Sequence, residues 1–254
     1  DYTLVYVDAG RYTTGGAKLN GQNSRLAISG KLMRFLGAGS GKSFIVGARD
    51  DGAEDGLGAN AWRCLSAGNA SIVQGFTLEG GYSGSSASEN AYYGGAVYGK
   101  KNATQVVDCE ITGCVSAWYT VHYADLIRCR MTKCTSTGGG QIRDARLVNS
   151  LVYNTVNKTS DSSGQAIVNA YSELHFSTIA GEGNCKVRRD LVSSYNCIFF
   201  RGTSYYVTGD TYPCMGDIFA FMGTSSGVLG DVVMKLMDPK FVAPDGFDFH
   251  LRRD

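Results

Sequence analysis

Proline, histidine and long apolar runs are all scarce in this chain of 254 residues. Three prolines stand against 34 glycines, and there are three histidines. No apolar run approaches the roughly 18 residues that a membrane-spanning helix needs. The formal net charge is +1 and the charges are scattered, so no basic stripe indicates a nucleic-acid partner. The composition therefore excludes a membrane-spanning helix, gives no argument for nucleic-acid binding, and leaves little histidine for acid–base chemistry.

A short phrase recurs down the middle of the chain. It reads VVDCEITGC at 106–114, LIRCRMTKC at 126–134 and LVNSLVYNT at 147–155, with looser copies at 71–81, 173–183 and 193–202. Aligned on one central residue, the copies are anchored at Phe76, Cys109, Cys129, Ser150, Ser177 and Cys197. The regular steps are about 20 residues long, a period at which one unit of a solenoid stacks on the next to bury a shared core.

Each copy alternates apolar and polar residues, which is typical of a β-strand. The position two residues after the anchor is always apolar, as Leu78, Ile111, Met131, Val152, Ile179 and Phe199. A second strand precedes most copies, with inward residues Val97, Val121, Ile142, Val168 and Val187. Helical solenoids need apolar residues at three- and four-residue spacing, which these segments lack. The sequence therefore predicts an all-β fold, a parallel β-helix with rungs of about 20 residues.

Charges on neighbouring rungs support this register. Asp108 is expected to lie over Arg128, and Glu110 over Arg130. Opposite charges on adjacent strands contribute about 0.2–1 kcal/mol each. The many glycines suit the sharp corners of such a coil, where φ is positive.

Insertions between the regular copies leave from the same part of each rung. The longer ones include 82–93 and 157–164, and smaller ones lie at 115–119 and 135–140. In a solenoid such loops line one edge, which is often the binding face. We expect this edge to present an aromatic wall of Tyr82, Tyr92, Tyr93, Trp118 and Tyr119. The alternative is that the rings fold down and cover the apolar edge of the coil.

A column of outward residues runs beside this wall, with one member on each rung. Its members are Tyr98, His122, Arg143, Asn169 and Arg188, and Asp144 and Asp190 lie just beyond it. A shallow groove with an aromatic rim and arginines suits an acidic polysaccharide, because arginine pairs with carboxylate or sulfate in a bidentate manner. The alternative is purely geometric, since every face of a β-helix exposes one residue per rung.

The rungs at Gly75–Gly81 (GFTLEGG) and Asp108–Cys114 (DCEITGC) resemble those of the pectate-lyase-like right-handed parallel β-helix superfamily, in its secreted, cysteine-bearing surface-protein form. The segments VYVDAGRY at 5–12 and DPKFVAPDGFDFHLRRD at 238–254 resemble its opening and closing turns. Asp108 and Cys114 depart from it, because that group favours asparagine there. The resemblance implies one right-handed β-helix domain over 1–254, with opening turns at 1–36 and a closing segment at 238–254.

The same resemblance implies a secreted or cell-surface location. The closing segment of such proteins usually continues further, so we expect a processed protein or a part of a longer surface polypeptide. The superfamily includes lyases, hydrolases, adhesins and tailspikes, so the fold alone does not select an activity.

The eight cysteines do not form a zinc motif, because no histidine accompanies the C-x4-C pairs and their side chains point largely into the core. Stacked residues lie close enough for disulfides between Cys109 and Cys129 and between Cys114 and Cys134. Their parallel Cβ vectors would strain such bonds, and cysteine is a good small apolar filler. Both alternatives stay open, with buried free thiols favoured.

Catalytic signatures are missing. A lyase would have to use Arg143 or Arg188 as base with His122 assisting, and calcium would need a carboxylate cluster that Asp144 and Asp190, two rungs apart, do not make. The compact N-T-D and G-H-G motifs of related hydrolases are absent, and the only D-D, at 50–51, lies in a glycine-rich turn.

We therefore expect a non-catalytic extracellular module for adhesion, glycan binding or surface assembly, with no metal or cofactor. The alternative is a polysaccharide lyase or glycoside hydrolase that acts on an acidic polysaccharide. The expected partner is a polysaccharide or cell-surface glycan, and stacking of one copy on another through open strand edges is a further prediction.

Overall fold

A computed structural model describes residues 2–30, 32–84, 89–158, 166–169, 171–180, 186–187, 192–200, 214–215, 218–220, 235–236, 241–243 and 248–251. Arg188, Asp190 and Cys185, which the sequence singled out, lie outside these ranges. No helix among the described residues is long and apolar enough to cross a membrane.

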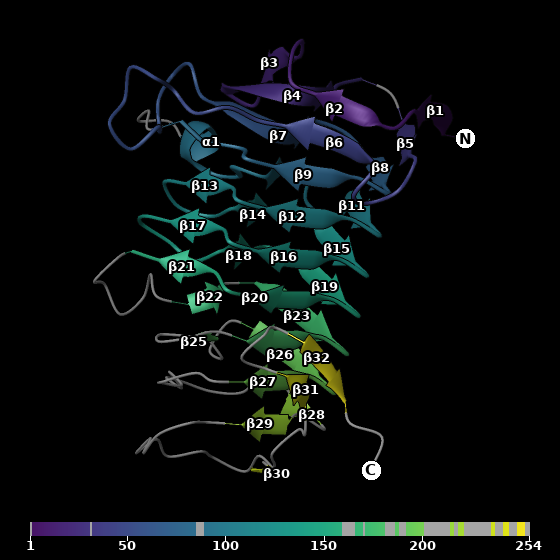
Figure 1. The fold of residues 1–254 in the computed structure, drawn as a ribbon, viewed down its shortest axis with the longest axis vertical. Helices are drawn as coiled ribbons and strands as arrows, with labels where there is room; N and C mark the ends of the chain where they lie inside the picture. The colour runs from purple at the N-terminus through teal and green to yellow at the C-terminus, as the bar shows by residue number, and fades with distance from the viewer. Residues whose placement is uncertain are drawn as a thin grey trace.

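Three long sheets of mainly parallel strands run the length of the molecule (Figure 1). Sheet A has nine strands: β1 (Thr3–Val7), β5 (Met33–Gly37), β8 (Ser71–Gln74), β11 (Thr104–Val107), β15 (Asp125–Ile127), β19 (Arg146–Val148), β23 (Ser172–His175), β26 (Val192–Tyr195) and β28 (Cys214–Met215). Sheet B has ten: β2 (Gly10–Tyr12), β6 (Ser43–Val46), β9 (Thr77–Glu79), β12 (Glu110–Thr112), β16 (Arg130–Thr132), β20 (Leu151–Tyr153), β24 (Thr178–Ala180), β27 (Ile198–Phe200), β29 (Ile218–Ala220) and β30 (Lys235–Leu236). Sheet C has eight: β3 (Ala17–Leu19), β4 (Gln22–Ile28), β7 (Trp62–Ala67), β10 (Val97–Tyr98), β14 (Val121–His122), β18 (Ile142–Arg143), β22 (Ala166–Val168) and β25 (Lys186–Val187).

Smaller elements complete the described chain. Three short strands form a fourth parallel sheet at the start of the insertions: β13 (Val115–Ser116), β17 (Thr135–Ser136) and β21 (Val156–Asn157). The short helix α1 (Glu89–Tyr92) lies in the first insertion, and β31 (Phe241–Ala243) pairs antiparallel with β32 (Asp248–Leu251). In Figure 1 the successive rungs lie along the long axis, with α1, β13, β17 and β21 at one edge. The predicted all-β, right-handed parallel β-helix is confirmed.

The core of the coil is built from the inward residues that the alternation predicted. Leu78, Ile111, Met131, Val152, Ile179 and Phe199 on sheet B are all buried. On sheet C, Val97 pairs with Val121, Val121 with Ile142, and Ile142 with Val168, in the predicted register. These side chains belong to one continuous apolar cluster, so each rung is stabilised by the rungs above and below it.

The anchor residues hold neighbouring rungs together from inside. The cysteine and serine side chains point into the core, and three of them accept a hydrogen bond from the amide of the anchor one rung earlier. Phe76 N donates to Cys109 Sγ at 3.3 Å, Cys129 N to Ser150 Oγ at 3.1 Å, and Ser150 N to Ser177 Oγ at 3.1 Å. The side chain also donates back to a carbonyl, as Ser150 Oγ does to Leu126 O at 3.1 Å. A small side chain with a donor and an acceptor satisfies both needs, and this explains the Cys/Ser series.

The corner before each anchor has a left-handed backbone. Gly75 has φ 75°, and the non-glycine residues at the same corner lie near φ 50°: Asp108, Arg128, Asn149, Phe176 and Asn196. Asn and Asp tolerate this conformation, whereas a residue such as Arg128 or Phe176 adopts it at some cost. The sequence predicted positive φ for glycines at such corners, and the structure shows that non-glycine residues adopt the same conformation there.

The two predicted charge pairs between rungs are confirmed. Arg128 Nε lies 2.6 Å from Asp108 Oδ1, and Arg130 Nη2 lies 2.7 Å from Glu110 Oε1. The arginine side chains are about half exposed, so each pair contributes at most about 1 kcal/mol. Of the two cysteine alternatives, the structure has free thiols at the described side chains, all buried: Cys64, Cys109, Cys114, Cys129, Cys134 and Cys197.

Candidate ligand-binding site

The predicted column on sheet C is in register, but the side chains of Tyr98, His122 and Asn169 are covered. Tyr98 pairs with His122, and His122 with Arg143. Tyr98, His122 and Asn169 are exposed by 7%, 2% and 3%. The expected shallow groove is therefore wrong for the described part of this face, because other side chains occupy the space above the column. A binding role for the column stays a prediction.

The covering side chains come from the predicted aromatic wall, which folds down over the column. The rings of Tyr93 and His122 have centroids 4.7 Å apart, and Tyr119 stacks parallel to His122 at 6.2 Å. Tyr123, at the next corner, lies 3.7 Å from the same imidazole. Tyr82 and Tyr92 are half-buried. Trp118 is 42% exposed at the rim. The alternative in which the rings cover the edge of the coil is the one that the structure shows.

A buried arginine holds the insertion that carries α1. Arg63 on β7 is fully buried, and its guanidinium donates hydrogen bonds to the carbonyl oxygens of Asn90 and, at 3.2 Å, Ala91. It also lies 4.9 Å from the ring centroid of Tyr98. Burial lowers the pKa of Arg63 to about 9. Within the described residues no carboxylate pairs with Arg63, so backbone carbonyls supply its compensation.

His122 is kept neutral by this environment. Burial, followed by the charge of Arg143, lowers its pKa from 6.5 to about 3. In the described part of the chain its Nδ1 atom has no hydrogen-bond partner. An imidazole that is 2% exposed lies out of reach of a polymer. Arg143 is partly exposed, with a side-chain exposure of 29%, and its Nε lies 3.2 Å from Asp144 Oδ2.

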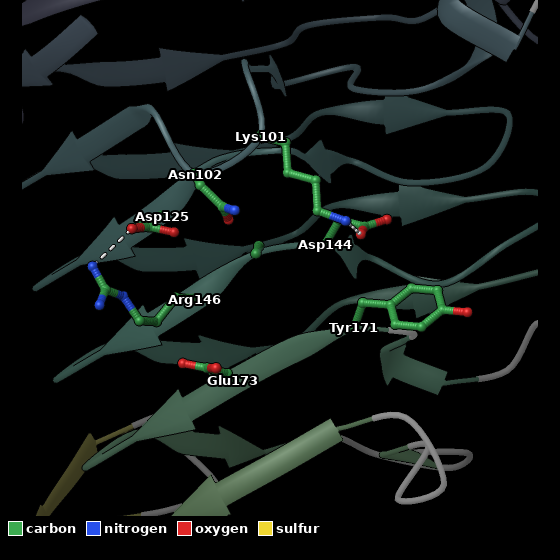
Figure 2. A pocket seen from close by; sticks show the side chains of 8 residues that line it. Lys101, Asn102, Asp125, Asp144, Arg146, Tyr171 and Glu173 are labelled. Atoms are coloured by element: carbon green, nitrogen blue, oxygen red, sulfur yellow. Dashed lines mark hydrogen bonds and ion pairs between the residues drawn. The ribbon is translucent and has the colours of Figure 1, made fainter. Parts of the chain in front are cut away.

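An open pocket lies at the next corner, where sheet C turns into sheet A (Figure 2). Its volume is about 360 Å³, and its lining residues are Lys101, Asn102, Asp125, Asp144, Ala145, Arg146, Tyr171 and Glu173. Most of these side chains are polar, and Figure 2 shows the ring of Tyr171 at one side and Glu173 below Arg146. The pocket lies directly beside the covered column, because Asp144 follows Arg143 in the chain.

Two ion pairs order the walls of the pocket. Lys101 Nζ lies 2.9 Å from Asp144 Oδ1, and Arg146 Nη2 lies 2.9 Å from Asp125 Oδ2. The Asp144 side chain is 5% exposed, whereas that of Lys101 is 53% exposed. The neighbouring carboxylate raises the pKa of Lys101 through a hydrogen bond and its charge. The pocket therefore contains a fixed, nearly buried carboxylate and a lysine that reaches it from the surface.

Local backbone geometry creates the pocket. Asp144 and Tyr171 are at or beside the sheet C–A corner with φ of 50° and 58°. One rung earlier the chain makes a wider turn, in which Ala103 N and Thr104 N both donate to Lys100 O, at 3.0 and 3.1 Å. This turn carries Lys101 over the corners below it. Asp144 was expected beside the column, whereas Lys101 and Tyr171 were not expected near it. The register of the three rungs is the signal that could have placed these residues together.

Other candidate chemistry finds little support in the described residues. No group of three or more His, Cys, Asp or Glu side chains among them is arranged to hold a metal ion. Asp50, from the D-D pair, is buried and accepts hydrogen bonds from the amides of Gly52 and Asn60, both at 3.0 Å. These hydrogen bonds lower the pKa of Asp50, and the bond from the Asn60 amide has the larger effect. Asp50 therefore stabilises the loop that contains Gly52 and Asn60, and it is not a solvated turn residue.

No protein-family model matches the chain, and no curated protein matches its sequence. Among solved structures, the catalytic domain of a GH87 alpha-1,3-glucanase in complex with nigerose has 13% identity and a TM-score of 0.43, and the match covers 85% of this chain and 34% of that chain. The same type of domain in complex with tetrasaccharides has 10% identity and a TM-score of 0.33, over 92% of this chain and 53% of that chain. A pectin methylesterase from carrot has 11% identity and a TM-score of 0.28, and the match covers 89% of this chain and 81% of that chain. The likeness concerns the fold alone, so a ligand has to be inferred from the residues of this chain.

Proposed function

We propose that the chain is a non-catalytic extracellular module that binds a glycan in the pocket between sheets C and A. The pocket carries this proposal because it combines an exposed aromatic ring with convergent polar groups. Tyr171 is 59% exposed, and Asn102, Asp125 and Glu173 lie around it. Sugars offer an apolar C–H face that packs on such a ring, and hydroxyl groups that bond to carboxylates and amides. A volume of about 360 Å³ suits a small ligand.

The charges of the pocket favour a neutral or cationic sugar. Three carboxylates line it, Asp125, Asp144 and Glu173, against two permanent cations, Lys101 and Arg146. Both cations are already paired with carboxylates. An acidic polysaccharide would meet an excess of negative charge, and like charges disfavour binding. The extracellular location belongs to the proposal, because it rests on the resemblance of the rungs to secreted β-helix proteins.

A glycan array followed by calorimetric titration tests the proposal. Tyr171→Ala removes the stacking ring and should weaken binding about tenfold, which corresponds to roughly 1.4 kcal/mol. Phe176→Ala is the matched control, because Phe176 is also 59% exposed and also has positive φ, 51°, yet lies outside the pocket lining. The proposal is abandoned if no glycan binds, or if the two variants weaken binding equally.

Hydrolysis is the second candidate, because glycosidases use a pair of carboxylates that flank the scissile bond. The pocket has three, but Asp125 and Asp144 are each engaged by a cationic side chain. A reducing-end assay on every glycan that binds separates the two functions. Turnover that Glu173→Gln abolishes would replace the binding module with a glycoside hydrolase.

A further inference from the structure

An ammonium group already occupies the pocket. Lys101 Nζ lies 2.9 Å from Asp144 Oδ1, 5.8 Å from the ring centroid of Tyr123 and 5.7 Å from that of Tyr171. Cations are attracted to aromatic faces within about 6 Å of the centroid. A carboxylate and two tyrosine rings thus surround a primary ammonium, and we call these three residues, Asp144, Tyr123 and Tyr171, the ammonium box.

The two sides of this contact differ in how firmly they are held. The side chain of Asp144 is 5% exposed, and Arg143 Nε lies 3.2 Å from its other oxygen, Oδ2. Lys101 enters from an exposed turn, and its side chain is 53% exposed. A ligand amine can take the place of Lys101 while Arg143 stays on Asp144, so the nearly buried carboxylate is not left unpaired during the exchange. The carboxylate of Asp144 is therefore the firmly held side of this contact.

A spare negative charge stands next to the box. Glu173 lines the same pocket and is 59% exposed on its side chain, and within the described residues no lysine or arginine pairs with it. Its nearest cationic group is His175 Nε2 at 3.6 Å, which is charged only when protonated. Glu173 follows Tyr171 by two residues, so a ligand that packs on the Tyr171 ring lies within reach of this carboxylate.

We infer that the pocket takes an amino sugar with a free, protonated amine, which displaces Lys101 from the ammonium box. The inference rests on the proposed glycan-binding function and names its ligand class. The amine binds Asp144 and the two rings, the sugar ring packs on Tyr171, and Glu173 accepts a hydrogen bond or pairs with a second amine along the chain. N-acetylation removes the charge and abolishes this mode of binding.

Titration with a glucosamine tetramer and an N-acetylglucosamine tetramer, at a pH where the free amines are protonated, tests the inference. The unacetylated tetramer should bind about tenfold more tightly. Glu173→Gln should reduce this preference several-fold, whereas Glu54→Gln, which removes an equal charge from an exposed loop residue, should leave it unchanged. Lys101→Met removes the competing ammonium and should strengthen binding of the unacetylated tetramer. Lys100→Met, which removes the same charge one residue away, should not have this effect.

The outcomes separate the inference from the function on which it rests. Equal binding of the two tetramers, or binding of a neutral glucan alone, overturns the inference and leaves glycan binding intact. Equal effects of Lys100→Met and Lys101→Met also overturn it, because the gain would then reflect overall charge. Binding of a lysine-rich peptide in preference to any sugar overturns both, as does a failure to bind every glycan.

Discussion

The buried imidazole of His122 should make the stability of this protein fall as the pH is lowered from 7 to 4.5. The imidazole has a pKa of about 3 in the folded chain and an ordinary value of 6.5. Below pH 6.5 the imidazole of His122 is protonated in the unfolded chain but stays neutral in the folded chain. The free energy of unfolding therefore decreases as the pH falls from 6.5 towards 3. Each pH unit within this window costs up to about 1.4 kcal/mol. Between pH 7 and pH 4.5 the loss from His122 alone is about 2.5 kcal/mol.

Urea denaturation at pH 7.0, 5.5 and 4.5 measures this loss directly. His122→Gln removes the titrating group, and its free energy of unfolding should change much less between pH 7.0 and 4.5 than that of the natural chain. The variant should start from a lower stability, because it loses contacts with the rings of Tyr93, Tyr119 and Tyr123. His175→Gln, at an imidazole with a side-chain exposure of 30%, is the control and should keep the full dependence.

The carboxylates of Asp50 and Asp108 do not explain a loss of stability between pH 7.0 and 4.5. Hydrogen bonds from Arg128 lower the pKa of Asp108, and hydrogen bonds from backbone amides lower that of Asp50. The stability that such groups contribute is present above their ordinary value of 3.8 and disappears only as the pH falls through their lower folded value. A His122→Gln chain whose stability falls as steeply between pH 7.0 and 4.5 as that of the natural chain would show that His122 is not buried in its neutral form.

Three further predictions concern the core. Met131→Ala, at a fully buried position of the continuous cluster, should lower the free energy of unfolding by about 2–5 kcal/mol, as measured by urea denaturation. Gly81→Ala should destabilise the chain by about 1–3 kcal/mol, because the new Cβ atom would lie 2.1 Å from Gly95 O and 2.8 Å from Cys64 Sγ; an unchanged melting temperature would contradict this contact. The thiols of Cys109 and Cys129 should resist alkylation in the folded chain and react when it is unfolded. Both are buried, and burial raises the pKa of Cys129 to about 12 and also raises that of Cys109. Rapid modification of either thiol in the folded state, detected by mass spectrometry, would refute their burial.

The rungs could be predicted from the sequence because their signal is local and repeated. Alternation placed Ile111, Met131 and Val152 in the core, and the steps between copies fixed which residues stack. The charge pairs at Asp108 and Glu110 follow from the same register. A one-residue shift in the alignment of any copy would turn its apolar residues outward. The alternation of apolar and polar residues therefore allows only one register for each strand.

The candidate site could not be predicted in the same way, because it depends on how irregular segments fold back. Tyr93 and Tyr119 pack on His122, and Arg63 binds the carbonyl oxygen of Ala91 in the insertion that carries Tyr93. Nothing in the repeat distinguishes a ring that points to solvent from one that covers a neighbouring rung. Predicting the pocket would have required the position of the Lys100–Thr104 turn relative to the later corners at Asp144 and Tyr171. That position depends on the tertiary structure and not on the local sequence pattern.

The anchor column also bears on the environments in which this fold can persist. After Phe76 it carries both thiol and hydroxyl side chains, and Cys109 and Ser150 make the same two kinds of contact, one with an amide and one with a carbonyl. Neither contact requires sulfur chemistry, since each cysteine there acts as a small polar filler. The described rungs are therefore held by packing and hydrogen bonds, and these contacts do not require an oxidising environment.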